Sequence, residues 1–120
     1  MIFETIGDIS VSRLNGKVTL EQMVQQVTDV IFQARKQQIR KLMLVTAGLT
    51  GFKLASVAER YFYVTQWAEA AGGMMRVAVV TRAERIDADK FGIMVAENLG
   101  VTSNVFASEE EAVAWLKSLP

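Results

Sequence analysis

Hydrophobic and polar residues alternate over the first twelve positions, which is the pattern of half-buried strands. The segments IFETIG and ISVSRL flank Gly7-Asp8, a dipeptide that suits a two-residue hairpin turn. In the second segment Ile9 and Val11 alternate with serines, so this strand has one apolar face. The pattern therefore predicts a β-hairpin at the N-terminus.

A change to apolar spacings of three and four residues then predicts the first helix. Thr19 and Gln22 have the spacing of a capping box, in which each side chain caps the backbone of the other. Asn15-Gly16 marks a turn just before this box, and the helix is expected to end near Arg35. The apolar positions that share one face of this amphipathic helix are Leu20, Met23, Val24, Val27, Ile31 and Ala34.

Two continuous apolar runs follow, KLMLVT at 41–46 and MMRVAVVT at 74–81. Such runs are typical of strands that are covered on both faces. A second helix is expected between them, ending at Gly72-Gly73, because paired glycines readily stop a helix. Two buried neighbouring strands with a helix between them indicate a parallel sheet.

The remaining segments complete an alternating order of strands and helices. A helix containing Phe91, Val95 and Leu99 precedes a short strand, NVF, and a terminal helix opened by Ser108 and Glu111 as a capping box. The order β-β-α-β-α-β-α-β-α demands a mostly parallel sheet with right-handed crossovers. The sequence therefore predicts one α/β domain over residues 1–120, with a mixed, mostly parallel sheet, an N-terminal hairpin and about four helices.

Charge and composition narrow the function. Thirteen Lys and Arg balance thirteen Asp and Glu, which argues against nucleic acid binding as the main task. The chain has no histidine and no cysteine, so it lacks the commonest general base, the thiolate nucleophile and the commonest transition-metal ligands. It also offers neither a serine elbow nor convincingly spaced paired carboxylates. We therefore expect no enzyme, no cofactor and no metal.

Nothing in the sequence indicates a membrane-embedded protein. The longest apolar runs, such as MMRVAVV, are far shorter than the ~20 residues that a transmembrane helix needs. Met1 leads straight into a strand pattern, without a charged-then-apolar leader and cleavage site. We expect a soluble, cytoplasmic protein with no integral membrane segment.

The stretch from Thr50 to Trp67 raises the question of where its aromatic side chains lie. If Leu54 is the angular reference and each residue turns the helix by 100°, Tyr63 and Trp67 fall together on the polar side, four positions apart. Tyr and Trp commonly anchor interfaces. The sequence thus favours a homodimer or protein-partner interface, although coverage by the neighbouring helix or the chain's termini stays open. The residues of the expected interface are Arg60, Tyr63, Trp67 and Ser56, and the expected core stripe contains Leu54, Val57, Ala58, Tyr61, Thr65 and Ala68.

A second candidate site is the loop expected after the third strand. The run TAGLTG lies between a buried strand and a helix N-terminus, where backbone N–H groups and the helix dipole favour an anion. It lacks the Gly-Lys-Ser/Thr of a P-loop, so the glycines could serve only a tight connection. The residues of this possible small-ligand or partner loop are Gly48, Thr50, Gly51, Phe52 and Lys53.

The charged stretch from Arg82 to Lys90 allows several interpretations. Arg82 and Arg85 could bind an anion, and the carboxylates could bind a hard cation. Because the signs of the charges alternate, a solvated loop with Asp87 or Asp89 as the cap of the next helix is the favoured interpretation.

Three segments resemble the SpoIIAA-like branch of the STAS family, named for sulfate transporters and anti-sigma factor antagonists. SVSRLNGKVTLEQMVQQV is similar to the family's second strand, glycine turn and first helix, and KLMLVTAGLTGF to its central strand and following loop. VFASEEEAVAWL resembles the family's ending, a short strand followed by an acidic-capped helix. The resemblance implies a non-catalytic regulatory or protein-interaction domain, with a small-ligand binding protein for a lipid or anion as the alternative.

The family's phosphorylation motif is altered in this chain. In anti-sigma factor antagonists, a serine in an Asp-Ser-Ser-Gly-type turn at the start of the second helix is phosphorylated by a partner kinase. Here the corresponding run is FKLAS, with Lys53 in the place of the acid and Leu54 and Ala55 in the places of the serines. Ser56 is displaced by one residue, or ~100° around a helix. We therefore expect an interaction domain without the usual phosphoserine switch.

Overall fold

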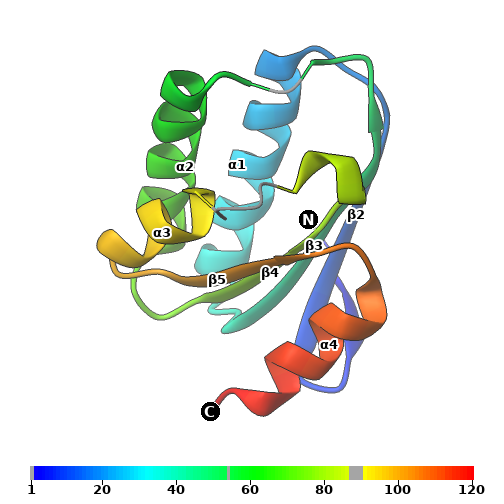
Figure 1. Cartoon of the computed structure of the whole chain (residues 1–120). Coiled ribbons are helices and arrows are strands. Elements are labelled where there is room, and N and C mark those ends of the chain that lie inside the picture. The colour runs from blue at the N-terminus through cyan, green and yellow to red at the C-terminus, as the bar shows by residue number, and fades with distance from the viewer. Residues whose placement is uncertain (1, 54, 87–90) are drawn as a thin grey trace.

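A sheet in the order β1-β2-β3-β4-β5 forms the centre of the computed structural model, which describes residues 2–53, 55–86 and 91–120 (Figure 1). The order of elements along these residues matches the prediction, with one added 3₁₀ turn at Ala83–Arg85. The elements are β1 (Glu4–Ile6), β2 (Ile9–Lys17), α1 (Leu20–Lys36), β3 (Lys41–Thr50), α2 (Val57–Ala71), β4 (Arg76–Val80), α3 (Phe91–Asn98), β5 (Thr102–Phe106) and α4 (Glu109–Ser118).

The predicted fold class is confirmed. β1 and β2 form the antiparallel hairpin, with Glu4 opposite Val11, and every later neighbour in the sheet pairs in parallel. Gly7 turns the hairpin with a φ of 60°, a backbone conformation that L side chains rarely adopt. The capping box of Thr19 and Gln22 is present at the start of α1. The result is an α/β fold in which the described residues form a mixed sheet and four α-helices.

The helices lie on both faces of the sheet, which explains the continuous apolar strands. Figure 1 shows α1, α2 and α3 on one face and α4 on the other. Successive side chains of a strand point to opposite faces, so Leu42 and Leu44 of β3 join the core under α1 and α2, whereas Met43 and Val45 join the core under α4. All four are buried.

Two strands are longer than the sequence predicts. The expected turn at Asn15-Gly16 is wrong, because β2 continues to Lys17 after a register shift between Arg13 and Asn15. β3 correspondingly continues to Thr50, so the expected loop at TAGLT is strand. β4 pairs only with Lys41–Val45, and the second half of β3 therefore extends beyond β4.

An ion-pair cluster joins the hairpin to α4. The Arg13 guanidinium donates to both carboxylate oxygens of Glu109, at 2.6 and 3.2 Å, and to Glu4 at 2.6 Å. The hydrogen bonds from Arg13 lower the pKa of the Glu109 carboxyl below its usual range, although partial burial acts in the opposite direction. The contact holds the first turn of α4 against β2.

We expect Arg13→Met to lower stability by ~1 kcal/mol or less at neutral pH, since both partners are largely exposed. Because the folded-state pKa of Glu109 is depressed, its contribution is present above the unfolded pKa of ~4.3 and is lost as pH falls through the folded value. The difference in thermal midpoint between wild type and Arg13→Met should therefore shrink below about pH 4. A Glu110→Gln variant, in the same helical turn, is the control, and a difference independent of pH would contradict the ion-pair explanation.

Candidate functional site

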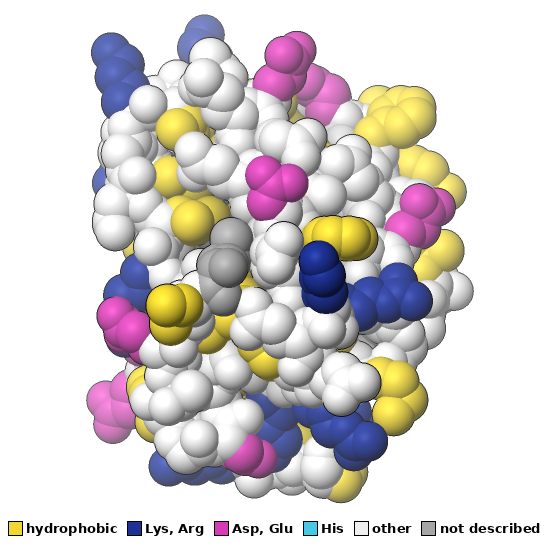
Figure 2. All heavy atoms as spheres, turned by 180° about the vertical axis from the view of Figure 1, so that it is seen from behind, with side chains coloured by type: hydrophobic (Ala, Val, Ile, Leu, Met, Phe, Trp, Pro, Cys, Tyr) yellow, Lys and Arg dark blue, Asp and Glu magenta, His cyan; other side chains and the backbone are white. Residues whose placement is uncertain are grey.

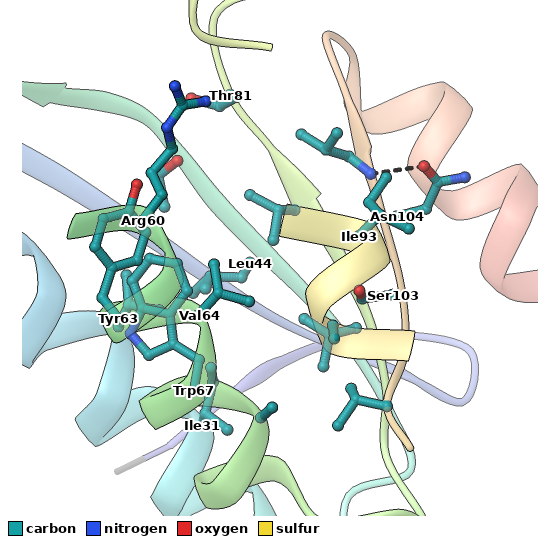
Figure 3. A pocket seen from close by; sticks show the side chains of 18 of the residues that line it. Ile31, Leu44, Arg60, Tyr63, Val64, Trp67, Thr81, Ile93, Ser103 and Asn104 are labelled. Carbon is teal, nitrogen blue, oxygen red and sulfur yellow. Dashed lines mark hydrogen bonds between the residues drawn. The ribbon is translucent and has the colours of Figure 1, made fainter. Parts of the chain in front are cut away.

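A pocket of about 230 Å³ lies between the sheet and the helices α1, α2 and α3 (Figure 3). Its floor is formed by every second residue of three neighbouring strands, and the helices supply its walls. In open parallel sheets, ligands gather at the carboxyl ends of the strands, and the pocket extends to that edge. The floor includes Leu44 and Thr46 of β3, Val79 of β4 with Thr81 directly after that strand, and Ser103 and Val105 of β5.

The orientation of α2 differs from the sequence prediction, and this difference creates the pocket wall. Tyr63 and Trp67 were expected on an outward polar face, which is wrong: both line the pocket and are half-buried. The Trp67 indole Nε1 donates to the carbonyl oxygen of Val24 at 3.2 Å, and the two ring centroids lie 4.6 Å apart. The two rings instead follow the alternative expectation, in which the neighbouring helix covers them.

The expected core stripe of α2 is correspondingly wrong at Val57, Ala58 and Tyr61, which are exposed. Tyr61 is 54% exposed and Val57 is 58% exposed, while Ala68 is buried as expected. The helix begins at Val57 after its N-cap Ser56, so an angular reference at position 54 lies outside the helix, and residue 54 lies outside the described residues. Ala68 and Ala71 are buried where α2 packs against its neighbouring helices, and this tertiary packing decides which face is inward.

The carboxyl-end edge of the pocket is its polar end. Thr46 and Thr81 end the floor on β3 and β4, and both are buried. Arg60 of α2 points toward the same end as Thr81 in the close-up (Figure 3), and its Nε atom is buried. Burial raises the pKa of the Tyr63 phenol, while the positive charge of Arg60 lowers it. At neutral pH this end therefore offers a guanidinium and neutral hydroxyl groups.

Arg82 and Arg85 complete the free edge of β3 and do not form an anion-binding pair. Arg82 Nε donates to the Ala47 carbonyl at 2.8 Å, and Arg85 donates to the carbonyls of Thr46 at 3.2 Å and Leu49 at 2.5 Å. These carbonyls lie on the part of β3 that extends beyond β4, so the arginines replace a strand as donors. The predicted cap at Asp87 or Asp89 lies outside the described residues.

The predicted ligand loop is divided between several environments. Gly48 and Thr50 belong to β3, where Gly48 pairs with Asn15. Gly51 has a φ of 96°, and a Cβ there would lie 2.7 Å from the Lys17 side chain, so glycine is needed for the chain to leave the strand.

Beyond Gly51 the loop turns to the pocket and then to the start of α2. Phe52 lines the pocket, with the Arg85 guanidinium 4.8 Å from its ring centroid, whereas Lys53 is exposed. Ser56 is the N-cap of α2, its hydroxyl accepting from the Glu59 amide at 3.2 Å. Of the predicted loop, only Phe52 therefore contributes to the pocket.

Several pocket residues were missed by the sequence analysis. Thr46 and Thr81 each end an apolar run, and Ser103 interrupts the alternation of Val101 and Val105. A polar residue at the pocket-facing position of a buried strand was the signal that could have found them. Their alignment on three adjacent strands depends on the register, which residue patterns do not contain.

The described residues contain neither an evident metal centre nor a membrane span. No group of three or more His, Cys, Asp or Glu among them is placed to hold a metal ion. None of the helices they form combines the length and apolar character that crossing a bilayer requires. Within this part of the chain, the pocket of Arg60 and the three hydroxyl-bearing strand residues is the feature best suited to bind a molecule.

Comparison with known proteins places the domain in a family. Residues 9–117 match the family model described as SpoIIAA-like, a range that runs from β2 into the last helix. No curated protein and no solved structure matches the chain. Because the match covers nearly the whole domain, the resemblance in the three quoted segments is confirmed. The chain belongs to the SpoIIAA-like family.

Proposed function

We propose that this domain is a non-catalytic binding protein that holds a small, elongated amphiphilic anion in the pocket between the sheet and α2. The observation that carries the proposal is the polarity of the pocket. Its walls are largely apolar side chains, whereas Arg60, Thr46 and Thr81 gather at the carboxyl ends of the strands. Apolar pockets with a few convergent polar groups are the usual form of a small-molecule site.

The residues of the pocket suit binding better than chemistry. A reaction would need a general base or nucleophile beside the cation, but the described residues that line the pocket include no carboxylate and no lysine. A guanidinium beside hydroxyl groups is instead a common way to hold a carboxylate or phosphate by charge-assisted hydrogen bonds. The apolar walls would bury the rest of the ligand, at about 25 cal/mol for each Å² removed from water.

Binding of such a ligand should raise the thermal midpoint, because a ligand that binds only the native state adds ~2.7 kcal/mol at 100 times its Kd. The test measures the midpoint with octanoate, an aromatic carboxylate and an alkyl phosphate. Arg60→Met should weaken anion binding by roughly tenfold or more, since a charge-assisted hydrogen bond contributes about 1.5–3 kcal/mol. Lys53→Met removes an exposed cation and is the matched control. Equal loss in both variants, or no stabilisation by any of these anions, would overturn the proposal.

A second candidate function is self-association through the outer face of α2. Phe62 is 76% exposed, and Val57 and Tyr61 of the same helix are also more than half exposed. Figure 2 shows hydrophobic side chains along the right-hand edge, the side on which α2 lies. The expected homodimer would thus use Val57, Tyr61 and Phe62, while Tyr63 and Trp67 remain inside.

Phe62→Glu should weaken such a dimer by at least tenfold, because burying a phenyl ring contributes about 1.5–3 kcal/mol. Sedimentation velocity over a range of protein concentrations measures the change. Met94→Glu, a comparably exposed position on α3, is the control. A wild-type protein that stays monomeric at all concentrations would contradict self-association. It would leave the proposed ligand binding unaffected.

A further inference from the structure

The pocket has a second polar group, far from its cationic end. At β5 the pocket is lined by Val101, Ser103, Asn104 and Val105. Successive strand side chains point to opposite faces, so the Ser103 hydroxyl shares its face with the two valines, whereas the Asn104 side chain accepts from the Val105 amide. The neighbour of Ser103 across the sheet is Val77 of β4. A hydroxyl surrounded by apolar groups is costly unless it has a hydrogen-bonding partner, and serine is not a residue that strands favour.

The sheet register gives the separation of the two polar ends. Val80 pairs with Phe106, so Thr81 lies level with position 107, and Ser103 is four residues back along the strand. At ~3.3 Å for each residue, this offset is about 13 Å. Ser103 and Arg60 both line the pocket, and Figure 3 shows Arg60 extending toward Thr81 while Ser103 lies apart on β5.

The separation of the two polar ends then indicates the length of the ligand. Two hydrogen bonds of ~3 Å, running partly along the axis, leave roughly 8–11 Å between the ligand's own polar groups. An extended chain advances about 1.25 Å for each carbon, because bonds of ~1.5 Å meet at the tetrahedral angle. This corresponds to roughly seven to nine carbons.

We propose that the ligand is a linear ω-hydroxy carboxylate of about eight carbons, whose carboxylate binds Arg60 and Thr81 and whose terminal hydroxyl binds Ser103. This inference rests on the proposed function, because it names the chemical class that the same pocket selects. Ser103 is then the residue that distinguishes this ligand from a plain alkyl acid. The walls between the two ends, including Leu44 and Val79, contact only methylene groups.

Isothermal titration with octanoate, 8-hydroxyoctanoate, 12-hydroxydodecanoate and 1,8-octanediol tests the inference. We expect wild type to bind 8-hydroxyoctanoate about fivefold more tightly than octanoate, the value of one net hydrogen bond. The longer hydroxy acid and the uncharged diol should bind at least tenfold more weakly. Ser103→Ala should remove the preference for the hydroxy acid while octanoate keeps its affinity, and Ser118→Ala, on the exposed end of α4, should change neither.

Each result other than the expected one contradicts a particular part of the inference or of the proposed function. A preference for the hydroxy acid that survives in Ser103→Ala, or tighter binding of octanoate, overturns the assignment of Ser103 and leaves the proposed function intact. Tighter binding of the longer acid overturns the size. If the diol binds as well as the acid, the carboxylate assignment fails. If none of these compounds binds, and neither an aromatic carboxylate nor an alkyl phosphate binds either, the proposed function itself fails.

Discussion

Trp67→Glu is expected to cost about 4 kcal/mol of stability or more, which is a large part of the total free energy of unfolding. Truncating a fully buried tryptophan costs about 3–5 kcal/mol, and half-buried Trp67 should contribute roughly half of that. Here the change also removes the hydrogen bond to the Val24 carbonyl and the ring contact with Tyr63, and it places a carboxylate against α1. A domain of this size has only about 6–18 kcal/mol in total.

Urea unfolding followed by far-ultraviolet circular dichroism measures this effect. The matched control is Phe62→Glu, the same change of character on the outer face of the same helix, where we expect at most ~0.5 kcal/mol. Trp67→Phe keeps an aromatic ring and loses only the N–H group, so it should cost about 1 kcal/mol. A Trp67→Glu protein as stable as wild type would show that α2 presents this side chain to solvent, as the sequence predicts.

The different effects expected for Trp67→Glu and Phe62→Glu depend on which face of α2 is inward. The residues of α2 alone do not determine that face. The hairpin, the capping box of Thr19 and the doubly covered strands follow from local patterns, because each involves residues close together in the chain. α2 has apolar residues on both sides, so its periodicity leaves the inward face open. Contact with α1 decides the inward face, through the hydrogen bond from the Trp67 indole to the Val24 carbonyl, 43 positions away in the chain.

The pocket depends on the register between strands even more than the orientation of α2 depends on its contact with α1. Thr81 and Ser103 are 22 positions apart in the chain, and their relation within one pocket follows from the pairing of β4 with β5. The order of strands could be predicted, because helices between strands demand parallel neighbours. The extension of β3 beyond β4 could not, since TAGLTG has the composition of a loop and its residues up to Thr50 become strand only by pairing with β2.

Arg85→Met is the second large effect that we expect, with a cost of about 2–4 kcal/mol. The variant removes the donors to the Thr46 and Leu49 carbonyls, and both of these residues are buried. A buried acceptor left without a donor costs about 1–3 kcal/mol, and the contact with Phe52 adds about 0.5–1 kcal/mol. Burial lowers the pKa of Arg85, yet the guanidinium stays charged at any ordinary pH, so the effect should not depend on pH near neutrality.

Hydrogen exchange locates the Arg85→Met effect as well as measuring it. Amides of residues 46–50 should exchange faster in the variant, while those of residues 41–45, which pair with β4, keep their protection. Lys53→Met removes a nearby exposed cation and should change neither region. Because Phe52 lines the pocket, Arg85→Met should also weaken anion binding severalfold without removing Arg60. Uniform loss of protection across β3 would contradict this account, since it would mean that Arg85 stabilises the whole sheet rather than the edge that β4 leaves open.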